Sequence, residues 1–135
     1  MDCNVRIFEE KDLDDVNELL TEAFSCTRGK LEGDQFTEIV AEMDGKVVGY
    51  LLLTRVLNPM KEKSYYLVDY VCVSSECRGH GIGKYLLDKA YLVAKENDAM
   101  YLQLTCSHFR IAAHKLYEKC NFIKRDSDIF RKEIV

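Results

Sequence analysis

The sequence has 135 residues and a mass of 15.6 kDa, and this length predicts one domain spanning residues 1–135. Its 23 acidic and 19 basic side chains give a net charge of −4. This acidic balance argues against a nucleic-acid-binding protein, because affinity for nucleic acid rests on basic side chains. A hydrophobic content of 47% and a charged content of 31% are typical of a globular chain and exclude wholesale disorder.

The charge is unevenly distributed along the chain. Residues 1–45 carry 13 acidic and 4 basic side chains, a net charge of −9, whereas residues 46–135 carry 10 acidic and 15 basic ones, a net charge of +5. The two portions could bind ligands of opposite charge, or they could simply form two solvated faces.

Six cysteines are present, but none has C-x-x-C spacing and no histidine pair completes a zinc pattern: Cys3, Cys26, Cys72, Cys77, Cys106 and Cys120. We find no charged leader with an apolar core and no apolar stretch of roughly 20 residues. We therefore expect a cytoplasmic protein with reduced thiols, with neither a membrane nor a nucleic acid as partner.

The first third predicts a strand, a helix and a loop. Residues 3–9 alternate like a short strand, and residues 13–24 carry apolar side chains at helical spacing. Asp12 is placed to cap that helix. Residues 26–36 are polar and contain glycine, which indicates a loop or a short helix.

Three strands are expected next. Asp44-Gly45, the strongest hairpin signal of the chain, separates a strand over residues 37–43 from a long apolar strand over residues 46–57. Residues 65–73 (YYLVDYVCV) form another long strand.

The remaining elements alternate between helix and strand. The turn RGHGIG, residues 78–83, opens a helix, residues 100–106 form a strand, and residues 109–119 form a second helix. Asn121 suits the left-handed position after a helix. Residues 123–125 and 129–134 are expected to pair as strands, which completes a mixed α+β sheet with helices on its faces.

The glycine-rich turn carries the clearest chemical signal. Glycines at a strand-to-helix junction let the backbone approach a ligand, and the amides of the new helix bind phosphate. The Rossmann pattern would need glycine where Lys84 or Leu86 stands, and the P-loop pattern would need Ser or Thr where Tyr85 stands.

Arg78, Gly81 and Gly83 match the (Q/R)-x-x-G-x-(G/A) signature of the GCN5-related N-acetyltransferases, and the chain resembles this family over essentially its whole length. The preceding VDYVCV resembles the family's fourth strand, and the later AHKLYEKCNF resembles its tyrosine-bearing helix. The resemblance implies the family's α+β fold, with a mixed sheet of about six or seven strands and about four helices.

The resemblance also implies acetyl-CoA as acetyl donor, with no metal. Backbone amides of one loop would hold the pyrophosphate: Arg78, Gly79, His80, Gly81, Ile82, Gly83 and Lys84. The backbone of Val71, Cys72 and Val73 would pair with the pantetheine arm where the fourth and fifth strands splay apart.

Two residues are candidates for proton transfer. Tyr117 matches the family tyrosine that can protonate the departing thiolate, although a core tyrosine is the plain alternative. Asp69, central in an apolar strand, is expected to be buried, and a buried carboxylate is costly. It could accept the amine's proton, bind a cationic substrate or act structurally, and a water molecule could be the base instead.

Arg110 stands where the family often has asparagine. The spacing Ser107, Arg110, Ala113, His114 and Tyr117 recurs in a subset of small-molecule acetyltransferases, including glucosamine-phosphate and aminoalkylphosphonate types. Arg110 is therefore a candidate for contacting a CoA phosphate or an anionic substrate group. His114 is expected to be structural, and a catalytic base is the alternative. Ser107 is placed to cap a helix that begins with His108.

The implied function is transfer of acetyl from acetyl-CoA to a primary amine of a small molecule or peptide, and the alternative is a non-catalytic acyl-CoA-binding sensor or interaction module. We expect acceptor specificity in the first helix, in residues 26–36 and in residues 57–64. The acidic first third suits a cationic amine, whereas Arg110 favours a phosphorylated or phosphonate amine. Formation of a homodimer is a further possibility that the sequence does not decide.

Overall fold

The structure is a computed structural model and describes residues 2–135. The chain forms two compact units, one ending at Thr105 and one running from Cys106 to Val135. The prediction of one domain over residues 1–135 stays a prediction.

The first unit is built around a single sheet in which the strands follow their order in the chain. Neighbouring strands are antiparallel from the first to the fourth, and the fourth and fifth are parallel. The strands are β1 (Cys3–Ile7), β2 (Phe36–Met43), β3 (Lys46–Asn58), β4 (Lys63–Val73) and β5 (Leu102–Gln103).

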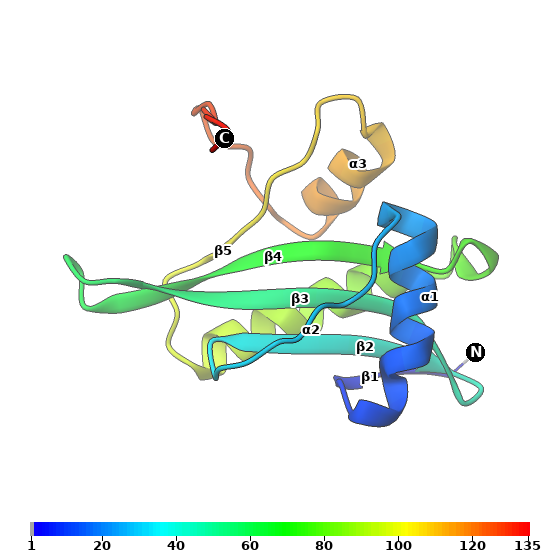
Figure 1. The fold of residues 1–135 in the computed structure, drawn as a ribbon. Coiled ribbons are helices and arrows are strands. Elements are labelled where there is room, and N and C mark those ends of the chain that lie inside the picture. The colour runs from blue at the N-terminus through cyan, green and yellow to red at the C-terminus, as the bar shows by residue number, and fades with distance from the viewer. Residues whose placement is uncertain (1) are drawn as a thin grey trace. The chain divides into compact units, whose positions relative to one another are not determined.

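Three α-helices accompany the sheet: α1 (Leu13–Phe24), α2 (Ile82–Glu96) and, in the second unit, α3 (Ile111–Lys119). α1 lies on one face of the sheet and α2 on the other (Figure 1). Two single 3₁₀ turns, η1 (Glu10–Asp12) and η2 (Ser75–Cys77), lie before α1 and before the glycine-rich turn. The mixed α+β class is confirmed, with five strands and three α-helices in the described chain rather than about six or seven and about four.

Each face of the sheet buries its own set of side chains. Because side chains alternate along a strand, Tyr50 and Val40 face α1 and pack with its residues Val16, Leu19 and Leu20. On the other face, a Cβ atom added to Gly49 would lie 3.0 Å from the side chains of both Ile82 and Leu86. A glycine at this position therefore lets α2 approach β3 closely.

The predicted hairpin between β2 and β3 is confirmed. Asp44 and Gly45 both have positive φ angles, 52° and 79°, as a two-residue turn between twisted antiparallel strands requires. The register continues across it, since Met43 pairs with Lys46.

Asp12 does not cap α1 as predicted. Its carboxylate accepts hydrogen bonds from Arg6 Nη1 at 2.8 Å, from Arg6 Nη2 at 2.9 Å and from the backbone amide of Glu9 at 2.8 Å. The side chain thus stabilises η1 and is 3% exposed, so the arginine on β1 outcompetes the helix amides.

Two further expectations differ from the structure. The strand expected over residues 100–106 is reduced to the two residues of β5. Residues 123–125 and 129–134 form no strand in the structure, whereas residues 26–35 form a loop, one of the two forms expected there. Phe130 and Ile134 are more than 90% exposed. Alternating apolar residues indicate a strand only when a partner covers them, and the second unit by itself supplies none.

No helix in residues 2–135 is both long enough and apolar enough to cross a membrane. All six cysteines are free thiols.

Candidate active site

A bulge interrupts β4 where the sequence placed candidate site residues. Asp69 pairs with Leu52 and Cys72 pairs with Tyr50, so two residues of β4, Tyr70 and Val71, stand opposite one residue of β3. Such a bulge shifts the alternation of side chains by one. Asp69 and Cys72 therefore face the same side of the sheet, the side that α1 covers.

Asp69 is exposed at this bulge, which corrects the expectation that it is buried. Partial desolvation still raises the pKa of its carboxyl group. Val68, the residue before it, is buried on the opposite face of the sheet. The apolar run around Asp69 therefore gives no sign that this position is left uncovered. A carboxylate reachable from solvent can meet a cationic ligand or accept a proton.

Around the bulge, β4 has an edge that β5 does not cover. The parallel pairing of β4 with β5 is limited to Tyr66 with Leu102 and Leu67 with Gln103. From Val68 to Val73, this edge of β4 has no β5 partner in the described ladder. Backbone groups along such an edge can pair with an extended ligand as with an added strand.

Cys72 offers only its backbone to that edge. Its side chain is 7% exposed and packs with the core between α1 and the sheet. Burial raises the pKa of this thiol to about 12, so the sulfur stays protonated and is a poor nucleophile at neutral pH.

The glycine-rich turn lies between η2 and α2. Gly79 and Gly81 have φ angles of 87° and 76°, a region that favours glycine. Gly81 is the residue before the first turn of α2, and the first helical hydrogen bond runs from the Tyr85 amide to its carbonyl, at 3.1 Å. The first turn of α2 carries no acidic residue, so its positive end suits an anion.

The exposed side chain of His80 belongs to the same turn. It lines a shallow hollow together with Ser74, Cys77 and residues of the β2–β3 hairpin. Its backbone remains part of the turn.

Sequence reasoning missed a cluster that holds the loop after α1. Arg28 donates to both carboxylate oxygens of Glu38, from Nε at 2.6 Å and from Nη2 at 2.8 Å, and the Tyr50 hydroxyl donates to the same carboxylate at 2.7 Å. Arg28 also stacks on Phe8, with 4.7 Å to the ring centroid, and its amide donates to Asn17. A charged residue in a polar loop gives no sequence signal that it will reach a buried glutamate.

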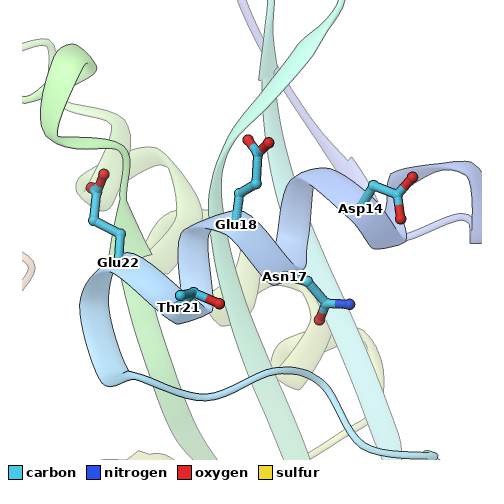
Figure 2. A pocket seen from close by; sticks show the side chains of 5 residues that line it. All are labelled: Asp14, Asn17, Glu18, Thr21 and Glu22. Carbon is cyan, nitrogen blue, oxygen red and sulfur yellow. The ribbon is translucent and has the colours of Figure 1, made fainter.

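The outer side of α1 is an acidic surface. Asp14, Glu18 and Glu22 recur every four residues and project from one side of the helix, with Asn17 and Thr21 beside them (Figure 2). Glu22 accepts hydrogen bonds from the amide of Ser75, at 2.8 Å, and from its hydroxyl, at 3.2 Å. This contact ties α1 to η2 and hence to the start of the glycine-rich turn.

The second unit holds Tyr117 in α3. The phenol ring contacts Phe122 edge-on, with ring centroids 5.9 Å apart, and the side chain is half-buried. Burial raises the pKa of this phenol, and Cys106 adds to the rise, whereas Arg110 opposes it. The hydroxyl therefore keeps its proton at neutral pH.

Arg110, Ser107, His114 and Asn121 lie at the two ends of α3 or within it. α3 begins at Ile111 with the exposed Arg110 as its N-cap, so Ser107 does not cap it through its side chain. Instead, the Ser107 carbonyl accepts hydrogen bonds from the Arg110 amide, at 3.1 Å, and from His114 Nε2, at 2.9 Å. Asn121 has a φ of 67°, as predicted for the end of this helix.

A model of the acetyltransferase (GNAT) family matches residues 4–122 of this sequence, and the chain belongs to that family. It is 30% identical over 92 residues to the uncharacterised N-acetyltransferase YhfO of Bacillus subtilis. It is 38% identical over 89 residues to an uncharacterised N-acetyltransferase of Methanocaldococcus jannaschii. These matches cover 68% and 62% of this chain, but only 62% and 53% of the two relatives.

Solved structures share the fold at low sequence identity. A ribosomal-protein-alanine N-acetyltransferase from Brucella melitensis superposes with a TM-score of 0.84 at 20% identity, covering 99% of this chain and 100% of the other. An aminoglycoside acetyltransferase from an uncultured soil metagenomic sample gives 0.85 at 16% identity, covering 98% and 96%. These neighbours show the fold of the chain and not its acceptor.

Proposed function

We propose that this chain transfers the acetyl group of acetyl-CoA to a primary amine. The observation that carries the proposal is the glycine-rich turn at the N-terminus of α2, which follows directly on the open edge of β4. The amides from Arg78 to Lys84 would hold the pyrophosphate, and the backbone of Val71, Cys72 and Val73 would pair with the pantetheine arm. In the second unit, Arg110 would contact a phosphate of CoA or an anionic group of the acceptor.

The described residues fit this cofactor. Gly81 has no side chain to cover the first amides of α2, and no acidic residue in the first turn repels a diphosphate. The β4 edge offers unpaired backbone groups at the spacing of an extended amide chain. Among residues 2–135 no three metal-ligating side chains come together. When bound, acetyl-CoA supplies an acetyl thioester that an amine can attack.

Tyr117 would serve as general acid. As the carbon–nitrogen bond forms and the carbon–sulfur bond breaks, its hydroxyl would give its proton to the sulfur of the departing thiolate. A phenol is a plausible donor because its ordinary pKa of about 10 is similar to that of a thiolate leaving group.

The amine must lose a proton for the reaction to balance. Asp69, exposed at the β4 bulge, is the side chain that we propose to receive it, directly or through water. Its raised pKa brings it closer to that of an effective base than an ordinary carboxylate.

The experiment is to measure release of free thiol from acetyl-CoA with a panel of primary amines, in parallel with CoA binding by calorimetry. We expect thiol release that depends on both an amine and the protein. CoA binding without release for any amine would favour a non-catalytic acyl-CoA sensor. Absence of CoA binding would contradict both functions.

A further inference from the structure

The bulge in β4 holds an aromatic residue in a disfavoured backbone conformation. Tyr70 has a φ of 57°, which bulky residues rarely adopt because Cβ crowds the following carbonyl oxygen. It is the one aromatic side chain among the six non-glycine residues with positive φ in residues 2–135. Bulges with this geometry usually take glycine. Strained backbone of this kind clusters at functional sites, so it directs attention to the side chain of Tyr70.

The Tyr70 ring lies where α1 ends. It meets Phe24, the last residue of α1, edge-on, with ring centroids 5.3 Å apart and an interplanar angle of 89°. Phe24 is half-buried against the core, whereas Tyr70 remains 48% exposed. Phe24 therefore fixes the orientation of the Tyr70 ring, and much of that ring is left accessible to a ligand.

Asp69, the residue before Tyr70 in β4, adds a negative charge next to the bulge. The bulge leaves Asp69 on the face of the sheet that α1 covers, and its carboxylate is exposed. An aromatic face and a carboxylate both attract an ammonium group. The same carboxylate repels a phosphate or phosphonate.

We propose that Tyr70, with Phe24 and Asp69, binds the acceptor as an alkylammonium, a cationic amine without an anionic group near its nitrogen, and that Tyr70 determines this specificity. The inference rests on the proposed function. A pantetheine arm that runs along β4 from Val73 to Val71 brings its thioester to the bulge. An amine held by Tyr70 then lies next to the acetyl group.

The test compares butylamine with aminopropylphosphonate as acceptors for the wild type, Tyr70→Gly and Tyr70→Phe. Tyr91→Ala is the control, because Tyr91 is a comparably exposed tyrosine on α2, on the other face of the sheet. We expect Tyr70→Gly to raise the KM for butylamine about tenfold. In Tyr70→Gly the KM for acetyl-CoA should not rise and the midpoint of thermal unfolding should not fall, because glycine suits the positive φ at this position. Tyr70→Phe keeps the aromatic face and should retain the wild-type KM.

Binding of tetramethylammonium to the CoA-bound protein, measured by calorimetry, provides a readout without turnover. This cation cannot be acetylated, so its binding does not depend on turnover. A loss of tetramethylammonium binding in Tyr70→Gly would therefore support the inference even if no amine released thiol and the proposed function failed. The inference is overturned if Tyr70→Gly leaves both butylamine KM and tetramethylammonium binding unchanged. It is also overturned if Tyr91→Ala has the same effect, or if aminopropylphosphonate is the better acceptor of the wild type.

Discussion

Tyr117 combines partial burial with a phenol whose pKa is raised, mainly by desolvation. We predict that Tyr117→Phe lowers kcat by about 100-fold, because general acid catalysis contributes on this scale. The KM for acetyl-CoA should change much less, since the ring and its contact with Phe122 remain. Steady-state kinetics at saturating amine measure both constants. Tyr91→Phe, a change of the same chemistry on α2, is the control, and an unchanged kcat in Tyr117→Phe would remove it as the acid.

The Arg6–Asp12 pair makes stability depend on pH. The Arg6 guanidinium lowers the pKa of Asp12 below its usual 3.8, so the folded state releases this proton more readily than the unfolded state. The stabilisation is therefore fully present above about pH 4 and is lost as the pH falls through the lowered pKa.

Asp12→Asn should consequently lower the free energy of unfolding at pH 7 by about 2 kcal/mol, because it removes the carboxylate nearest to a largely buried guanidinium, at 2.8 Å, and leaves only those of Glu9 and Glu42, at 3.5 Å. The difference from the wild type should shrink below pH 4, as urea denaturation at several pH values would measure. Asp34→Asn removes a carboxylate that is 96% exposed, 3.9 Å from Arg55, and should have no effect at either pH. A deficit of Asp12→Asn that is equal at all pH values would contradict the account.

For single residues, the sequence predicts local backbone conformation better than it predicts interaction partners or exposure. The glycine signature located the turn before α2, and Asn121 was assigned its left-handed conformation from local chemistry alone. Asp12 and Asp69 were misjudged for a different reason. The partner of Asp12 lies on another element, and the exposure of Asp69 depends on which positions of β4 other elements cover, which the apolar pattern of β4 does not encode.

Among the elements, the contact between α2 and β3 depends on one missing side chain. Gly49→Ala would place a Cβ atom 3.0 Å from side-chain carbons of Ile82 and Leu86 and 3.3 Å from that of Ala41. We predict a loss of about 1–3 kcal/mol in the free energy of unfolding, as for other overpacked cores. Gly29→Ala is the matched control, because nothing lies within 4 Å of the added atom. Urea denaturation of both variants measures the difference, and equal stabilities would refute this view of the packing.

Elements with local signals were predicted well. β2, β3 and their turn, as well as β4 and α1, agree with the expected ranges to within one or two residues, and α2 begins at the predicted turn. The prediction fails for three strands, because a strand exists only through pairing with another segment. These are β5, which is shorter than expected, and the strands expected over residues 123–125 and 129–134. The Tyr70 bulge likewise arises from the register of β4 against β3, which no pattern within β4 reveals.

For the whole molecule, the proposed function gives the uneven charge distribution a role, because the two portions suit two ligands of opposite charge. The glycine-rich turn, Arg110 and Tyr117 belong to the portion with a net charge of +5, which suits the anionic CoA. The portion with a net charge of −9 contains α1, whose outer side bears three regularly spaced carboxylates (Figure 2). A cationic acceptor would be attracted to that portion.

The most direct test of the central claim is mass spectrometry of primary amines incubated with the protein and with acetyl-CoA that carries an isotopic label in its acetyl group. The account predicts an N-acetylated amine containing the label, formed in step with free CoA thiol and strongly reduced with Tyr117→Phe. Binding of CoA without any labelled acetyl-amine would contradict it.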